Sequence, residues 1–315
     1  MPSTRLRTLG TAGVYCLANR GVELWFEAWA RSFRRFNPDL PALVIPFDGH
    51  VGRVRRICDR FGIGMVRSAE AARFEELGRA HYPSQAIAAR TYRKLYAFFG
   101  VFEHFLFLDA DVLVLDELSS LLSRFAVSGL DVGYFDTDLD QVYVPGALRE
   151  SMAVERGAVG INTGSFLGRR DCLSEARLQE SSAFFLRNRA QFRRLYEQPF
   201  LSHCLESSGL RVAAAASVAP WIGATWVGDE KLRMPEGLSS SVPSTAAQEV
   251  RAPFVHFAGT ELKFRMPHAE TFLAFAPLRV RLILLLRQLA NGVRRRLKRQ
   301  GAVAPPAPGR AGRRG

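Results

Sequence analysis

Residues 105–115 read Phe105-Leu106-Phe107-Leu108-Asp109-Ala110-Asp111-Val112-Leu113-Val114-Leu115. Nine of these eleven residues are apolar, which is typical of a strand buried on both faces of a parallel or mixed sheet. Asp109 and Asp111 are costly to bury as carboxylates, so we expect them where the strand leaves the core. In an extended backbone both side chains would point to the same side of the strand. Two carboxylate oxygens on one side are suitable ligands for Mg²⁺ or Mn²⁺, and phosphate oxygens could complete the coordination. The alternative is a strand-end turn with two solvated aspartates.

Strands and helices alternate ahead of this stretch. Apolar runs predict strands at Ala12–Ala18, Ala42–Phe47 and Ile63–Val66. Apolar residues spaced three and four apart predict helices at Val22–Phe36 and Val51–Phe61. This β-α-β-α-β order predicts an α/β fold with right-handed crossovers and a largely parallel sheet, and ligand binding beyond the carboxyl ends of its strands.

The remaining elements are predicted by the same patterns. We expect a helix from Pro83 to about Gly100 and a mostly helical stretch at Leu173–Ser207, with a break at Glu197-Gln198-Pro199. Strands are expected at Asp131–Phe135 and Phe254–Gly259, and Gly160–Gly168 is a glycine-spaced apolar segment. Pro235–Gln248 is expected to be a mobile loop. We expect acceptor pockets in loops such as Pro145–Ala158 and Trp221–Gln248, because binding residues concentrate in loops.

The charge of the chain is concentrated at its C-terminal end. The net charge is +13, but eleven of the 43 Lys and Arg residues lie from Pro277 onward, where there is no acid, which leaves 32 basic and 30 acidic residues elsewhere. Of the four widely spaced cysteines, Cys16 and Cys204 fall in apolar or helical patterns and are expected to be buried thiols. That favours a reducing cytosol. We expect neither a signal peptide nor a spanning helix.

Several separated residues suggest one chemistry when they are taken together. A helix with Lys94 precedes the aspartate pair, Asn162 and Gly164 follow about fifty residues later, and His256 precedes Gly259 and Lys263. They offer ligands for a divalent metal, cations for phosphate and backbone for close approach, which suits a diphosphate leaving group. Each has a simpler explanation alone: a solvated helix lysine, a tight turn, or an ordinary histidine at a strand end.

The chain resembles the GT-A sugar-nucleotide transferases, in particular the group of glycogenin and the bacterial lipopolysaccharide galactosyl- and glucosyltransferases. Four stretches carry the resemblance, which extends over Ala12–Pro267: Val14–Gly21, Lys94-Leu95-Tyr96 with Phe107–Val112, Ile161–Gly164, and His256–Gly259 with Lys263. The family's Lys-Pro appears here as Lys263-Phe264, one residue further on, with Arg265 as a possible substitute. Its Asp-Gln pair appears as Glu197-Gln198.

The resemblance implies a reaction and a role for each matching residue. A hexose would pass from a nucleoside diphosphate sugar, UDP-linked, to a hydroxyl acceptor such as a glycan or lipid-linked envelope acceptor, with retention of configuration. The implied metal ligands for Mn²⁺ or Mg²⁺ are Asp109, Asp111 and His256. Asn19 would line the nucleotide, Gly164 and Gly259 the donor, and Lys263 the diphosphate. Lys94, Asn162 and Gln198 would contact the donor sugar, with Gln198 at its anomeric face.

Two other functions compete with this one. A nucleotidyltransferase that makes sugar nucleotides should have a glycine-rich basic loop after the first strand, and Ala18-Asn19-Arg20-Gly21 is too sparse for that. A non-enzymatic basic adaptor for membranes or nucleic acid would rest on the C-terminal charge alone. The nearly neutral body indicates no nucleic-acid partner.

We expect three parts in the chain: a GT-A domain at 10–275, a basic amphipathic helix at 277–300 and a disordered tail at 301–315. In the helix, leucines recur every three or four residues from Leu278 to Leu297 between arginines. The apolar run Leu282–Leu286 is too short to span a bilayer, so the pattern predicts a helix lying on an anionic membrane surface. The enzyme would then be cytoplasmic and peripheral on the inner face of the cytoplasmic membrane. The alternative is a helix docked on the protein itself.

Overall fold

The computed structural model describes residues 11–234 and 250–301, with side chains as far as residue 290. The chain divides into two compact units, Met1–Thr260 and Glu261–Gly315. The expected mobile loop Pro235–Gln248 and nearly all of the expected disordered tail lie outside the described residues. The expected domain boundaries stay a prediction.

The first unit is a seven-stranded sheet in the order β3-β2-β1-β4-β7-β6-β8, with a separate pair β5-β9. The strands are β1 (Ala12–Ala18), β2 (Ala42–Pro46), β3 (Gly64–Met65), β4 (His104–Asp109), β5 (Val112–Val114), β6 (Val132–Tyr134), β7 (Ser165–Arg169), β8 (Val212–Ala214) and β9 (Phe254–His256). β7 pairs antiparallel with both of its neighbours, and the other pairings within the large sheet are parallel. The predicted α/β fold with a mostly parallel sheet is confirmed.

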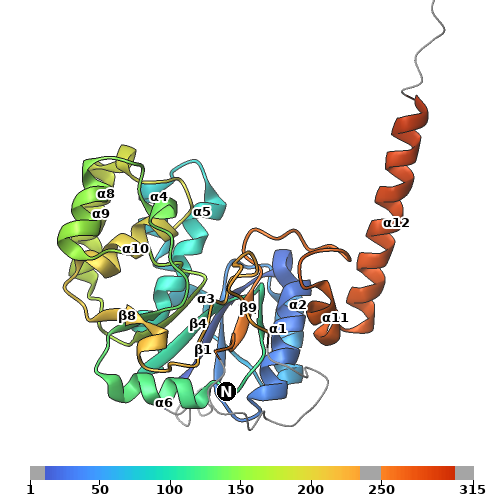
Figure 1. Cartoon of the computed structure of the whole chain (residues 1–315), viewed down its shortest axis with the longest axis horizontal. Helices are drawn as coiled ribbons and strands as arrows, with labels where there is room; N and C mark the ends of the chain where they lie inside the picture. Colours follow the sequence, from blue (N-terminus) through green and yellow to red (C-terminus); the bar gives the residue numbers. More distant parts are fainter. Residues whose placement is uncertain (1–10, 235–249, 302–315) are drawn as a thin grey trace, which may run out of the picture. The chain divides into compact units, whose positions relative to one another are not determined.

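Helices lie on both faces of this sheet (Figure 1). The α-helices of the first unit are α1 (Glu23–Phe36), α2 (Gly52–Phe61), α3 (Ser68–Ala72), α4 (Glu75–His81), α5 (Ala86–Thr91), α6 (Ser119–Ser128), α7 (Leu139–Val142), α8 (Ala147–Arg156), α9 (Glu175–Arg187) and α10 (Gln198–Ser207). The 3₁₀ segments are η2 (Arg20–Val22), η3 (Tyr92–Phe99), η4 (Arg189–Gln191) and η5 (Ala215–Ser217), of which η3 has eight residues and the others three each. The second unit has α11 (Ala269–Phe275) and α12 (Leu278–Gly301).

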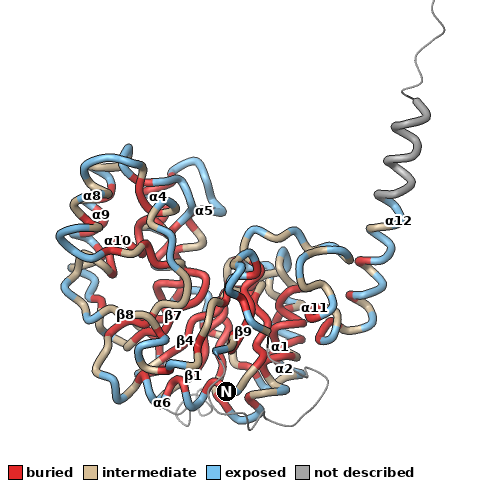
Figure 2. The backbone as a smooth tube through the Cα atoms, viewed as in Figure 1, coloured by how far each residue is buried: buried red, intermediate tan, exposed pale blue. Residues whose placement is uncertain are grey.

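The strand side chains alternate between two hydrophobic cores. Tyr15 and Phe105 belong to a core with residues of η3, α9 and α10, whereas Cys16 and Leu106 belong to one with residues of α1, α2 and α6. Strands buried on both faces require the continuous apolar runs seen in the sequence, and the central strands β1 and β4 are buried except at their ends (Figure 2). Cys16 and Cys204 are buried free thiols, as expected.

Three predicted elements differ from the structure. Residues 105–115 form not one strand but two, β4 and β5, because the chain turns at Ala110-Asp111 and β5 pairs with β9 instead of continuing in the large sheet. The break expected at Glu197-Gln198-Pro199 falls just before it, and α10 begins at Gln198 with Pro199 in its first turn, where a missing N–H costs nothing. The expected loop Pro145–Ala158 contains helix α8.

Candidate active site

The aspartate pair and His256 meet at the end of the central strand. Asp109 is the last residue of β4, and its backbone N–H donates to the carbonyl of Gly164 at 2.8 Å. His256 ends β9 and pairs with Val112, so it stands beside Asp111, whose carbonyl accepts from the N–H of Phe257 at 2.9 Å. The pairing of β5 with β9, two strands far apart in the sequence, therefore brings a carboxylate pair and an imidazole to one place.

The geometry of these three side chains fits a divalent metal. One ligand atom from each of Asp109, Asp111 and His256 lies within 4.8 Å of the others. Nε2 of His256 is 3.4 Å from Oδ1 of Asp111, and Nδ1 is buried without a hydrogen bond from any described residue. Two carboxylates and an imidazole form a donor set suited to Mn²⁺ or Mg²⁺.

Gly164 makes room for this cluster. A Cβ atom at this position would lie 2.1 Å from Cε1 of His256, 2.8 Å from Nε2 and 3.0 Å from Oδ2 of Asp109. Any side chain would therefore fill the space that the imidazole and the carboxylate occupy. Asn162 supports the same turn, since its Oδ1 accepts from the Gly164 N–H at 2.9 Å.

Burial and neighbouring charges shift the pKa values of these three side chains in different directions. Burial raises the pKa of Asp109 to about 6, against the attraction of Lys94 and with the repulsion of Asp111. Burial acts the same way on Asp111, but the charge and hydrogen bond of His256, together with the charge of Lys94, outweigh it and lower the Asp111 pKa. For His256, burial favours the neutral ring, and the neighbouring carboxylates raise its pKa above the ordinary value. Both carboxylates are partly exposed, so a ligand can reach them.

Lys94 lies under the site rather than on its surface. Its buried ammonium is 2.6 Å from Oε1 of Glu197 and 3.6 Å from Oδ2 of Asp109, and it donates to the Thr163 carbonyl at 3.0 Å. Burial opposes the charge, but the two carboxylates raise the Lys94 pKa above its usual value. The Thr163 hydroxyl also donates to Glu197, at 2.9 Å. The lysine thus ties Asp109, a candidate metal ligand, to the start of α10.

Gln198 begins helix α10 next to this ion pair. Its Nε2 donates to Oε1 of Gln141 at 2.9 Å, and this bond fixes the amide relative to α7. The side chain is half-buried. Gly259 follows His256 by three residues with a φ of +73°, a left-handed conformation that favours glycine. Its predicted contact with the donor stays a prediction.

Asn19 lies at the carboxyl end of β1 and has a partner that the sequence analysis missed. Its Nδ2 donates to Oδ2 of Asp48 at 2.8 Å, and its Oδ1 accepts from the Gly21 N–H. Arg90 approaches the same carboxylate at 3.7 Å. Burial opposes ionisation of Asp48, but the hydrogen bonds from Asn19 and the His50 N–H keep its pKa low. The signal for Asp48 was its place just after β2, beside β1 in a parallel sheet.

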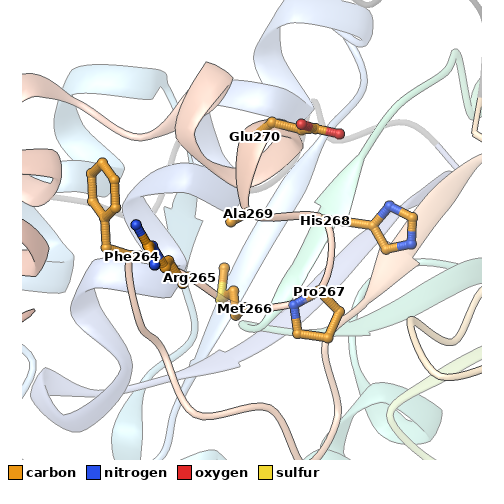
Figure 3. A pocket seen from close by; sticks show the side chains of 7 residues that line it. All are labelled: Phe264, Arg265, Met266, Pro267, His268, Ala269 and Glu270. Carbon is orange, nitrogen blue, oxygen red and sulfur yellow. The ribbon is translucent and has the colours of Figure 1, made fainter.

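Lys263 belongs to the second unit, where its ammonium pairs with Glu261 at 2.6 Å. The same unit has a hollow of about 510 Å³ lined by seven consecutive residues, 264–270 (Figure 3). Its lining includes Arg265 and contains none of the residues predicted to bind metal or sugar. The predicted role of Lys263 at a diphosphate remains a prediction.

No family model matches the sequence, and no curated protein matches it either. Solved structures do match its fold. The apo structure of the WbbM bifunctional glycosyltransferase superposes with a TM-score of 0.56 at 13% identity, over 88% of this chain and 52% of that one. The galactosyltransferase LgtC, in complex with donor and acceptor sugar analogues, gives 0.55 at 17% identity, over 84% of this chain and 95% of that one.

These likenesses show that the chain has the GT-A fold, as the sequence motifs predicted. The chain spans about half the length of the WbbM chain and nearly the whole of the LgtC chain. At these identities the likeness establishes the fold, and the activity has to be argued from the site itself.

Proposed function

We propose that this protein is a metal-dependent glycosyltransferase that moves a hexose from a UDP-sugar to a hydroxyl acceptor with retention of configuration. The observation that carries the proposal is the convergence of Asp109, Asp111 and His256 at the end of β4 within a GT-A fold. LgtC, which shares this fold, was solved with donor and acceptor sugar analogues. In this proposal Asp109, Asp111 and His256 hold Mn²⁺ or Mg²⁺, which when bound stabilises negative charge on the departing diphosphate.

The other residues bind and orient the donor. Asn19, held by Asp48, lies at the carboxyl end of β1, where open α/β sheets bind nucleotides. Lys94 keeps Asp109 in position and adds a fixed positive charge beneath the sugar site. Asn162 shapes the turn at Gly164 against the donor. Gln198 presents its amide oxygen toward the sugar, because its amide nitrogen is engaged by Gln141.

The experiment is a hydrolysis screen of nucleotide sugars with the full-length chain, with Mn²⁺, with Mg²⁺ and with a chelator. We expect turnover of a UDP-hexose that requires the metal. Asp111→Asn should lower turnover at least about a hundredfold, since metal stabilisation of a leaving group contributes several kcal/mol. Asp59→Asn, which removes an exposed carboxylate on α2, is the matched control. Metal-independent turnover, or full activity in Asp111→Asn, would contradict the proposal.

The proposal includes attachment to an anionic membrane surface through α12, with the acceptor in a lipid-linked or envelope glycan. Leucines at positions 278, 282, 285, 286 and 289 are exposed along this helix. No helix in the part of the chain that the structure describes is long and apolar enough to cross a membrane. An in-plane helix with basic residues is attracted to acidic lipids at about 1 kcal/mol per charge.

The attachment is tested by sedimentation with phosphatidylserine-containing vesicles. The full chain should bind at low salt and release at high salt, and a chain truncated after Pro277 should stay in the supernatant. Equal binding by both forms would exclude the helix as the anchor.

A further inference from the structure

Trp226 is a half-exposed tryptophan beside the candidate metal site. Its side chain is 41% exposed, whereas its neighbours Thr225 and Val227 are buried. Residue 226 forms a parallel β-bridge with His256. The Val227 N–H donates to the His256 carbonyl at 3.0 Å, and the His256 N–H donates to the Thr225 carbonyl at 2.8 Å. The backbone that carries the indole is therefore fixed directly to a candidate metal ligand.

The indole itself is also held in place. Its Nε1–H donates to the Ala258 carbonyl at 3.3 Å. A Cβ atom on Gly228 would lie 2.5 Å from both Cη2 and Cζ2 of the ring, so the six-membered ring packs against bare backbone. Asp229 closes the turn by donating its N–H to the Trp226 carbonyl at 3.0 Å. The ring is supported by backbone and remains open to solvent.

Thr225, the residue before Trp226, lies next to the end of β6. Thr225 donates its N–H and its hydroxyl to the carboxylate of Asp136, just beyond β6, and the Asp136 carbonyl accepts from the Asn162 N–H at 2.9 Å. The nucleotide is expected at Asn19, after β1, which is three strand positions from β6 in the sheet order β1-β4-β7-β6. With strands about 4.8 Å apart, β1 and β6 are separated by roughly 14 Å.

We infer that Trp226 is the stacking platform for the acceptor, and that the acceptor is therefore a glycoside whose pyranose ring lies on the indole. A pyranose ring has an apolar face of C–H groups, and a fixed, half-exposed aromatic ring matches it in shape and in hydrophobicity. A ring locked before binding loses little side-chain entropy when the sugar arrives. This inference rests on the proposed function and names the class of its second substrate.

The test measures acceptor binding separately from donor binding. Full-length protein saturated with Mn²⁺ and UDP is titrated calorimetrically with lactose and with the methyl pyranosides of glucose, galactose and N-acetylglucosamine. We expect at least one of these sugars to bind, and Trp226→Ala to weaken that binding about tenfold or more. Trp226→Phe, which keeps an aromatic ring, should retain part of the affinity. UDP affinity in the presence of Mn²⁺ is measured in both variants and should fall less than the sugar affinity.

Trp221→Ala is the matched control, because Trp221 is a partly exposed tryptophan five residues away whose ring is covered by the Arg124 guanidinium at 4.9 Å. It should bind the sugar as the wild type does. Unchanged sugar affinity in Trp226→Ala would overturn the inference, as would a wild-type protein that binds UDP but none of these sugars. An equal loss of UDP affinity in Trp226→Ala would assign the ring to the nucleotide and would also overturn it. Failure of the wild type to bind UDP with Mn²⁺ would instead refute the proposed function.

Discussion

Replacing Gly164 by alanine probes the candidate metal cluster of Asp109, Asp111 and His256 with a single methyl group. The added Cβ would lie 2.1 Å from Cε1 of His256, a distance that real Cβ atoms essentially never show. The φ of Gly164 is not positive, so alanine adds no backbone strain and the clash is the whole effect. Overpacking of this kind costs about 1–3 kcal/mol if the imidazole stays in place.

The clash is relieved most readily by displacement of the His256 ring from the two carboxylates. Loss of a well-placed ligand contact then lowers metal affinity by about 10- to 100-fold, or about 1.4–2.8 kcal/mol. Calorimetric titration of the purified chain with Mn²⁺ measures this change directly, and thermal unfolding without metal shows how much of the cost falls on the fold.

Gly168→Ala is the matched control for this experiment. Gly168 lies in β7, and its added Cβ would meet Cζ of Phe105 at 2.3 Å, in the core rather than at the ligands. This variant should lose stability while its folded form binds Mn²⁺ normally. If Gly164→Ala bound Mn²⁺ as tightly as the wild type, the assignment of His256 to the metal cluster would be wrong.

Three further predictions concern the surroundings of the site. Gln198→Ala should lower kcat with little change in UDP affinity, and an equal loss of UDP binding would indicate a structural role instead. Lys94→Met should destabilise the fold by about 3–5 kcal/mol in chemical denaturation, because it leaves the Glu197 carboxylate buried without its positively charged partner. A variant as stable as the wild type would contradict the buried ion pair. Burial lowers the pKa values of His81 and His203 to about 4, below the usual 6.5. Between pH 4 and pH 6.5 the unfolded chain therefore binds more protons than the folded chain. Stability should therefore be full above pH 6.5 and fall as the pH decreases toward 4, by about 2 kcal/mol per histidine at pH 5, and a pH-independent free energy of unfolding across this window would refute it.

Local sequence pattern was enough to predict the alternating strands and helices. Strands β1, β2, β4 and β7 of the large sheet pack against both cores, and the hydrophobic run that this requires is visible in the chain itself, as in Ala42–Pro46. The residue at which β4 ends could not be predicted from the hydrophobic pattern. Val112–Val114 is as apolar as the strand before it, and what takes it out of the large sheet is pairing with Phe254–His256, some 140 residues later.

The site residues also differ in whether the sequence alone could predict their positions. Asp109, Asp111 and His256 stand next to strand ends, so motif and order along the chain could predict their meeting. Burial of Lys94 could not be predicted, because its partner Glu197, just before α10, lies about 100 residues later in the sequence. Trp226 had no motif at all, and its importance depends on a bridge to His256 that only the folded chain shows.

The most direct test of the central claim is a calorimetric titration of the full-length chain with UDP, with and without Mn²⁺, in the wild type and in Asp111→Asn. Metal held by Asp109, Asp111 and His256 should tighten UDP binding at least about tenfold, as expected when a cation bridges protein and diphosphate. Asp111→Asn should remove this gain and leave the metal-free affinity unchanged. The same UDP affinity with and without Mn²⁺ in the wild type would contradict the account.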